Sequence, residues 1–162
     1  MVILGIDPGL NRLGYGIIKK ENSNLIHISH GCITSSAKET MSDRIKHIYI
    51  ELEKIIEKFK PNSISLEKVF VKINPNTALK LGYVRGLLYL LSSQNHIPLA
   101  EYSAKEVKKG ITGYGQAEKE QVMMMVKNLL NISDIKYLDE SDALGLAIYH
   151  ANIEGFTQRI SS

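Results

Sequence analysis

Residues 1–11 of the chain read MVILGIDPGLN, and the interpretation of the remaining sequence starts from this stretch. Its apolar run predicts a strand buried on both faces, which Pro8 and Gly9 end directly after Asp7. Burying a lone carboxylate is costly, so we expect Asp7 at the open end of the strand with a positive group beside it. Turn chemistry alone explains Asp-Pro-Gly equally well, because all three residues are common in turns. Other carboxylates reaching the same place would decide between the two interpretations.

Length and composition are those of an ordinary globular protein. The 162 residues are 44% hydrophobic and 23% charged, which suits one domain, expected over 1–155, with 156–162 as a short tail. A net charge of +3 permits a nucleic-acid partner without requiring one. The single Cys32 cannot form an internal disulfide, and we expect a cytoplasmic protein with no secretory leader and no membrane span. The scattered histidines lack zinc-site spacing, so any metal is expected to have oxygen ligands.

Two further strands follow the first one closely. Alternating and apolar residues predict strands over 13–20 and 25–34, and the short connections predict an antiparallel meander. Gly14 and Gly16 share one face of the second strand, which allows a helix or a ligand to approach closely. They lack the GxGxxG spacing of a dinucleotide site.

The next helix and strand bring a second carboxylate. Apolar residues at three- and four-residue spacing predict a helix over 41–60, with Thr40 as its N-cap and Pro61 as its stop. A strand over 63–69 follows and carries Glu67. Because the helix forms a crossover between two strands, we expect this strand to lie parallel to the first. Parallel strands end on the same edge of a sheet, so Glu67 is expected beside Asp7.

The middle of the chain predicts a dimer. A helix over 77–94 is apolar almost all round, which is more than packing on one sheet face requires. We expect a second subunit to cover the excess; the alternative is a fully central helix in a monomer. After it we expect a strand over 97–102 and a short helix, AKEVKKG, capped by Ser103. A loop over 111–116 and a helix over 117–130 follow.

The last predicted helix, over 138–151, supplies two more acids. Asp139 and Asp142 are three residues apart and share one face of its first turn. Acids at a helix start are ordinary partners of the helix dipole. Joined by Asp7 and Glu67, however, they would repel one another and raise each other's pKa values unless a cation lay between them. Hard oxygen ligands suit Mg²⁺ or Mn²⁺, and two such ions about 4 Å apart promote phosphodiester hydrolysis. The pattern therefore predicts a nuclease site.

The motifs also resemble those of a known family. GIDPGLNRLGYG, LEKVF, NTALKLG followed by VRG, AEKEQV and DESDALGLA are similar, in order and spacing over nearly the whole chain, to the RuvC Holliday-junction resolvases. The resemblance implies an α/β protein with a ribonuclease H-like mixed five-stranded sheet flanked by helices. It also implies a homodimeric, Mg²⁺-dependent endodeoxyribonuclease that makes paired symmetrical nicks in four-way DNA junctions during recombination and repair. The family works beside the RuvA–RuvB branch-migration complex.

The resemblance implies roles for particular residues. The catalytic and metal-binding acids carry over to Asp7, Glu67, Asp139 and Asp142, holding two Mg²⁺ per subunit, with Mn²⁺ as a substitute. Asp7 is expected to be the ligand that both ions share.

DNA contacts are implied at four further positions. Lys108 in AKEVKK and Lys119 in AEKEQV would position phosphates and stabilise charge in the transition state. Phe70 and Lys72 lie in VFVK, where an aromatic ring can stack on bases at the crossover. Solvated lysines and a core phenylalanine are the structural alternatives for these residues.

Some segments depart from the family pattern, and three other functions compete. Lys68 stands where the family often has glutamine, and YVRG, ITGYGQ and FTQRISS are individual to this chain, so no cleavage-sequence preference is carried over. The first competing function is an ATPase of the actin–hexokinase superfold. It needs a second domain and further phosphate loops, which 162 residues with one Asp-Pro-Gly do not provide. The second is an RNA nuclease of the same superfold, and the motif ALKLG and the spacing of DESDALGLA argue against it. The presence of all four acids favours catalysis over a junction-binding module without activity.

Overall fold

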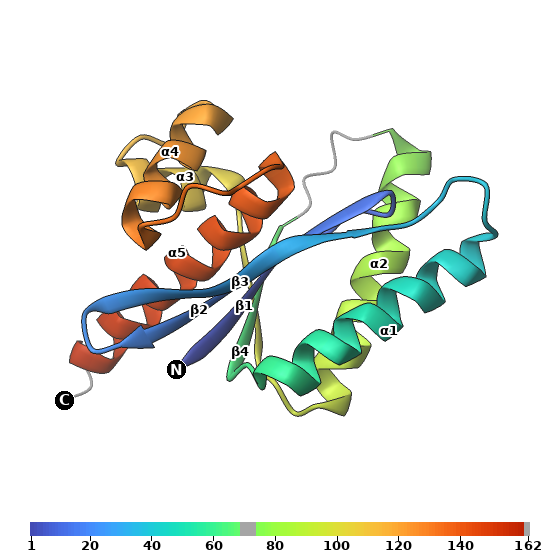
Figure 1. The fold of residues 1–162 in the computed structure, drawn as a ribbon, viewed down its shortest axis with the longest axis horizontal. Helices are drawn as coiled ribbons and strands as arrows, with labels where there is room; N and C mark the ends of the chain where they lie inside the picture. The colour runs from blue at the N-terminus through green and yellow to red at the C-terminus, as the bar shows by residue number, and fades with distance from the viewer. Residues whose placement is uncertain (69–73, 161–162) are drawn as a thin grey trace.

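The computed structural model describes residues 1–68 and 74–160, with the main chain alone over 155–160. Strands open the chain, and helices dominate its second half (Figure 1). The elements, in chain order, are β1 (Val2–Asp7), β2 (Arg12–Glu21), β3 (Asn24–Thr34), α1 (Met41–Phe59), β4 (Ser63–Glu67), α2 (Pro75–Gln94), β5 (Leu99–Tyr102), α3 (Ala104–Thr112), α4 (Lys119–Leu130) and α5 (Leu138–Ile160).

The strands form one mixed sheet with the order β3-β2-β1-β4-β5. β1, β2 and β3 pair antiparallel as the predicted meander, and β4 pairs parallel with both β1 and β5. Helices α1 and α2 cover one face of the sheet, while α3, α4 and α5 cover the other (Figure 1). This confirms the predicted ribonuclease H-like sheet flanked by helices.

The alternation of side chains along β1 directs Asp7 toward α5. Leu4 and Ile6 pack with the residues of α1 and α2, whereas Ile3 packs with those of α5. Residues at every second position of a strand share a face, so Gly5 and Asp7 lie on the α5 side with Ile3. In the parallel pair, Ile6 lies opposite Leu66. The next residue of β4, Glu67, is therefore level with Asp7 and on the same face.

Local capping signals set several helix ends as expected. The Thr40 hydroxyl accepts a hydrogen bond from the Asp43 amide at 3.2 Å, and Lys60, with φ of 46°, ends α1 before Pro61. Ser103 and Glu106 form the reciprocal capping box predicted at the start of α3.

Other helix ends differ from the prediction. The expected loop over 111–116 begins later, because buried Ile111 continues the apolar face of α3 and Gly113, with φ of 80°, ends that helix. α4 begins at Lys119 rather than at 117, since Glu118 is its N-cap. α5 continues past 151 to Ile160, and no proline follows that would stop it.

α2, whose sequence is apolar almost all round, leaves part of its apolar surface uncovered. One side of it packs into the core, through Val84, Leu87, Leu88 and Leu91. The large hydrophobic side chains that it exposes are Leu79, Tyr83, Tyr89 and Leu90. No helix in the described part of the chain is both long and apolar enough to cross a membrane.

Candidate active site

Glycines in β1 and β2 let the start of α5 lie directly on the sheet. Gly14 pairs with Asp7 in the β1–β2 register. A Cβ at Gly14 would stand 2.1 Å from the Asp139 carbonyl oxygen, and a Cβ at Gly5 would stand 2.0 Å from that of Ala143. Only glycine permits so close an approach of two backbones. The close approach predicted from the glycines of β2 is thus confirmed, and it brings Asp139 and Asp142 down toward Asp7.

A cavity of about 170 Å³ lies at this edge of the sheet, where β1, β4, α3, α4 and α5 converge. It contains three of the four predicted acids and two of the predicted DNA-binding lysines. The residues that line it are Asp7, Glu67, Ala104, Val107, Lys108, Lys119, Val122, Asp142 and Leu146. Carboxylates, amines and apolar side chains therefore share one small space.

Two of the acids have cationic partners that the sequence did not reveal. Lys119 Nζ lies 2.8 Å from Asp142 Oδ2. Arg12 Nη1 lies 3.4 Å from Asp139 Oδ2, and the Arg12 guanidinium also lies 4.2 Å from the centre of the Tyr137 ring. Asp139 does not line the cavity and flanks it instead. Arg12 stands within the motif GIDPGLNRLGYG, so its position was visible, but nothing in the sequence indicated its partner.

The acids at this site carry more negative charge than the nearby lysine offsets. Burial raises the pKa of Asp7 to about 8, and the charges of Asp142, Glu67 and Asp139 add to that increase, while Lys119 opposes it. Burial and the Asp142 charge also raise the pKa of Glu67 against the opposing charge of Lys119. The positive group expected beside Asp7 is therefore present, and the site still favours an additional cation.

The donor set fits a hard divalent cation. Asp7, Glu67 and Asp142 offer only carboxylate oxygens, which are the ligands of Mg²⁺ and Mn²⁺. Across residues 1–68 and 74–160, no three His, Cys, Asp or Glu side chains are already grouped to hold an ion. Lys119 engages Oδ2 of Asp142 and Arg12 engages Oδ2 of Asp139, which leaves Oδ1 of each carboxylate for a metal ion.

The raised pKa of Asp7 predicts how stability depends on pH without metal. The folded pKa of about 8 exceeds the ordinary value of 3.8, so between these values the unfolded chain releases a proton that the folded chain retains. The melting temperature in chelator should therefore fall as pH rises from 5 to 8. Asp7→Asn should flatten this slope, which circular dichroism can measure. Equal slopes for the two proteins would contradict the assignment of the titration to Asp7.

Two predicted DNA-binding residues, Phe70 and Lys72, lie outside the described residues, so the structure does not place them. A contact that the sequence did not indicate lies behind Glu67. Arg85, in the unusual YVRG segment, donates a hydrogen bond from Nη1 to the Glu67 carbonyl oxygen at 2.7 Å. That departure from the family pattern was the only sequence signal near this contact.

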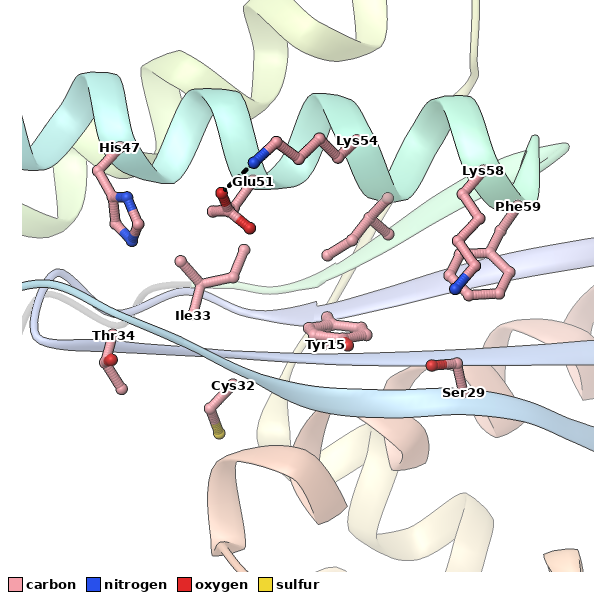
Figure 2. A pocket seen from close by; sticks show the side chains of 11 residues that line it. Tyr15, Ser29, Cys32, Ile33, Thr34, His47, Glu51, Lys54, Lys58 and Phe59 are labelled. Atoms are coloured by element: carbon pink, nitrogen blue, oxygen red, sulfur yellow. Dashed lines mark hydrogen bonds and ion pairs between the residues drawn. The ribbon is translucent and has the colours of Figure 1, made fainter.

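A larger hollow of about 350 Å³ lies between α1 and β3 and has different chemistry (Figure 2). The only carboxylate among its lining residues, Glu51, is paired with Lys54 at 2.7 Å. Lys58 Nζ lies 4.9 Å from the centre of the Phe59 ring. The Cys32 thiol points away from α1 (Figure 2), and burial raises its pKa to about 11. The described residues that line this hollow therefore offer no second acid with which to hold a divalent ion.

Comparison with known proteins agrees with the geometry. Residues 3–150 match the family described as Crossover junction endodeoxyribonuclease RuvC. The protein of that name from Pseudothermotoga lettingae is 40% identical over 162 residues, covering 99% of this chain and 100% of its own. The one from Geobacter sulfurreducens is 43% identical over 152 residues, covering 94% of this chain and 93% of its own.

Solved structures give the same result. Thermus thermophilus RuvC in complex with a Holliday junction substrate is 26% identical, with a TM-score of 0.92 over 97% of this chain and 96% of that chain. The yeast mitochondrial Holliday junction resolvase Ydc2, at 19% identity, shares the fold with a TM-score of 0.67, over 96% of this chain and 79% of that chain. By sequence match along most of its length and by fold, the chain belongs to the RuvC family of crossover junction endodeoxyribonucleases.

Proposed function

We propose that this protein is a structure-specific endodeoxyribonuclease that resolves four-way DNA junctions by paired symmetrical nicks, in recombination and DNA repair. The observation that carries the proposal is the cavity shared by Asp7, Glu67 and Asp142, with Asp139 at its flank. Family membership supports the choice of substrate, because a related RuvC was solved with a Holliday junction. The nuclease domain is proposed to span 1–155 and to act in the cytoplasm, where the lone Cys32 stays reduced.

Asp7, Glu67, Asp139 and Asp142 are proposed to hold two Mg²⁺ ions per subunit, with Mn²⁺ as a substitute. Bound metal would supply an activated water and stabilise the leaving oxygen of the cleaved phosphodiester. The protein holds these half-buried acids together at one edge of the sheet, where the repulsion between their charges favours the binding of a cation.

The cavity lysines are proposed to act on the DNA backbone. Lys119 already lies among the acids, 2.8 Å from Asp142, so its amine is placed to meet a phosphate that enters beside them. Lys108 lines the same cavity from α3. Both would orient the phosphate and stabilise negative charge developing on it. Phe70 and Lys72 remain predicted contacts to DNA near the crossover.

A homodimer is proposed to deliver the paired nicks, since two cuts in one junction are served best by two active sites. The exposed apolar residues of α2 support this face as the contact, the larger ones being Leu79, Tyr83, Tyr89 and Leu90. Cooperation with a RuvA–RuvB branch-migration complex is proposed on family membership alone.

A synthetic mobile four-way DNA junction tests the proposal. With Mg²⁺ we expect two nicks in opposed strands, each of which DNA ligase can reseal, and no cutting of a plain duplex of the same sequence. Chelator should stop cleavage, and added Mn²⁺ should restore it. Efficient cutting of the duplex, or hydrolysis of RNA in preference to the junction, would overturn the assigned substrate.

A further inference from the structure

A cluster of polar residues on the α2 side of the sheet lies behind Glu67. Arg85 of α2 donates from Nη1 to the Glu67 carbonyl oxygen at 2.7 Å and from Nη2 to the Tyr89 hydroxyl at 3.0 Å. Its guanidinium also forms an ion pair with Glu101 of β5. The Tyr89 hydroxyl donates to the same Glu101 carboxylate at 2.6 Å. Three side chains from two elements therefore form one connected group, in which Arg85 contacts the main chain of Glu67 and the other two contact Arg85.

The sheet alone leaves the Glu67 end of β4 only partly supported. The pairing of β4 with β1 stops at Leu66, opposite Ile6, one residue before Glu67. On the other side, the Lys68 amide donates to the Tyr102 carbonyl at 2.8 Å. The Glu67 carbonyl projects at the strand's end, where the Arg85 guanidinium is its hydrogen-bond donor. A charged donor makes a stronger hydrogen bond than a neutral one.

The charged pair of the cluster is largely shielded from water, while Tyr89 at its edge is 46% exposed. The Arg85 side chain is only 13% exposed and that of Glu101 27%, so each charge relies on the other more than on water. Glu101 lies opposite Leu66 in the β4–β5 register, and Leu66 packs on the α1 and α2 side of the sheet. The cluster therefore occupies the face opposite the cavity and does not line the cavity itself.

We infer that Arg85, braced by Glu101 and Tyr89, is a positioning residue that sets the place of Glu67 in the active site. Arg85 bonds the main chain of Glu67 and leaves its carboxylate free for the cavity. The inference rests on the proposed function, because it treats Glu67 as a metal-binding acid. Partners of this kind orient a ligand, and their loss weakens metal binding and activity without removing a ligand.

The test compares Arg85→Gln with the unchanged protein in three measurements. Single-turnover junction cleavage at limiting Mg²⁺ should fall by about 10- to 100-fold. Mn²⁺ affinity of the DNA-free protein, measured by electron paramagnetic resonance, should fall by about tenfold. Junction binding in chelator should stay within about twofold, because the proposed phosphate contacts, Lys108 and Lys119, are unchanged. Arg85→Lys should recover part of the loss, since its single amine keeps the positive charge but lacks the fork with which the guanidinium reaches three acceptors.

Lys54→Gln is the matched control, because it removes one positive charge and the exposed pair with Glu51 on α1. It should leave all three measurements unchanged. If Arg85→Gln does not fold, Tyr89→Phe removes only one hydroxyl and should lower Mn²⁺ affinity by about two- to tenfold. If Arg85→Gln folds and keeps wild-type cleavage and Mn²⁺ affinity, the inference is wrong. If Arg85→Gln does not fold, the same result in Tyr89→Phe would overturn the inference. If the unchanged protein does not cleave junctions, the proposed function fails, while Mn²⁺ affinity still reports on Arg85.

Discussion

Asp7→Asn is expected to abolish junction cleavage while leaving junction binding intact. Asp7 is central to the acid cluster, because three other carboxylates raise its pKa and the cavity places it beside Glu67 and Asp142. An asparagine keeps the shape and removes the charge that a divalent ion needs. Metal assistance contributes several kcal/mol to such reactions, so cleavage should fall by at least roughly 10³-fold. Single-turnover cleavage and a gel-shift assay in chelator measure the two properties separately.

A matched substitution separates this effect from a general loss of negative charge. Asp134→Asn makes the same chemical change at an exposed residue that does not line the cavity. It should cleave at the wild-type rate. Removing the Asp7 charge also relieves repulsion, so Asp7→Asn should melt at a higher temperature than the wild type at pH 8 without metal. Cleavage retained by Asp7→Asn would contradict the assignment of the metal site.

The second large effect is expected from Gly14→Ala, which adds one methyl group beneath α5. That Cβ would stand 2.1 Å from the Asp139 carbonyl oxygen and 2.4 Å from its carbon, and backbone atoms cannot rotate away. The start of α5 must therefore lift, carrying Asp139 and Asp142 away from Asp7. Overpacking of this kind costs about 1–3 kcal/mol of folding stability. A displacement near 1 Å at the reacting groups costs roughly 10²-fold in rate.

Thermal denaturation and junction cleavage measure the two consequences of Gly14→Ala. Gly16→Ala is the graded comparison, because the nearest atoms to its added Cβ belong to the Leu144 side chain at 2.7 Å, and the nearest backbone atom lies at 2.8 Å. It should lose less stability and less activity, since a side chain yields more easily and lies farther from the acids. A Gly14→Ala protein with wild-type stability and rate would show that α5 is not held against the sheet here.

Much of the fold was predictable because its causes are local in the sequence. Strand-length apolar runs joined by short turns predicted the meander of β1, β2 and β3, and the crossover through α1 predicted the parallel pairing of β4. Capping residues predicted where α1 and α3 begin. All four acids were predicted from strand ends and a helix start, and three of them, Asp7, Glu67 and Asp142, meet in one cavity. Each inference needs only periodicity, capping or turn chemistry over a few residues.

The partners of those acids depended on the tertiary structure. Arg12 and Asp139 are 127 positions apart, Lys119 and Asp142 are 23 apart, and Arg85 and Glu67 are 18 apart. No local pattern links such residues, since only the packed sheet and helices bring their side chains within a few ångströms. The burial that raises the pKa of Asp7 to about 8 arises in the same way. The sequence by itself determined which acids stand at the ends of β1, β4 and the start of α5. The tertiary structure decided which cations accompany them, because distance between side chains is a property of the packed chain.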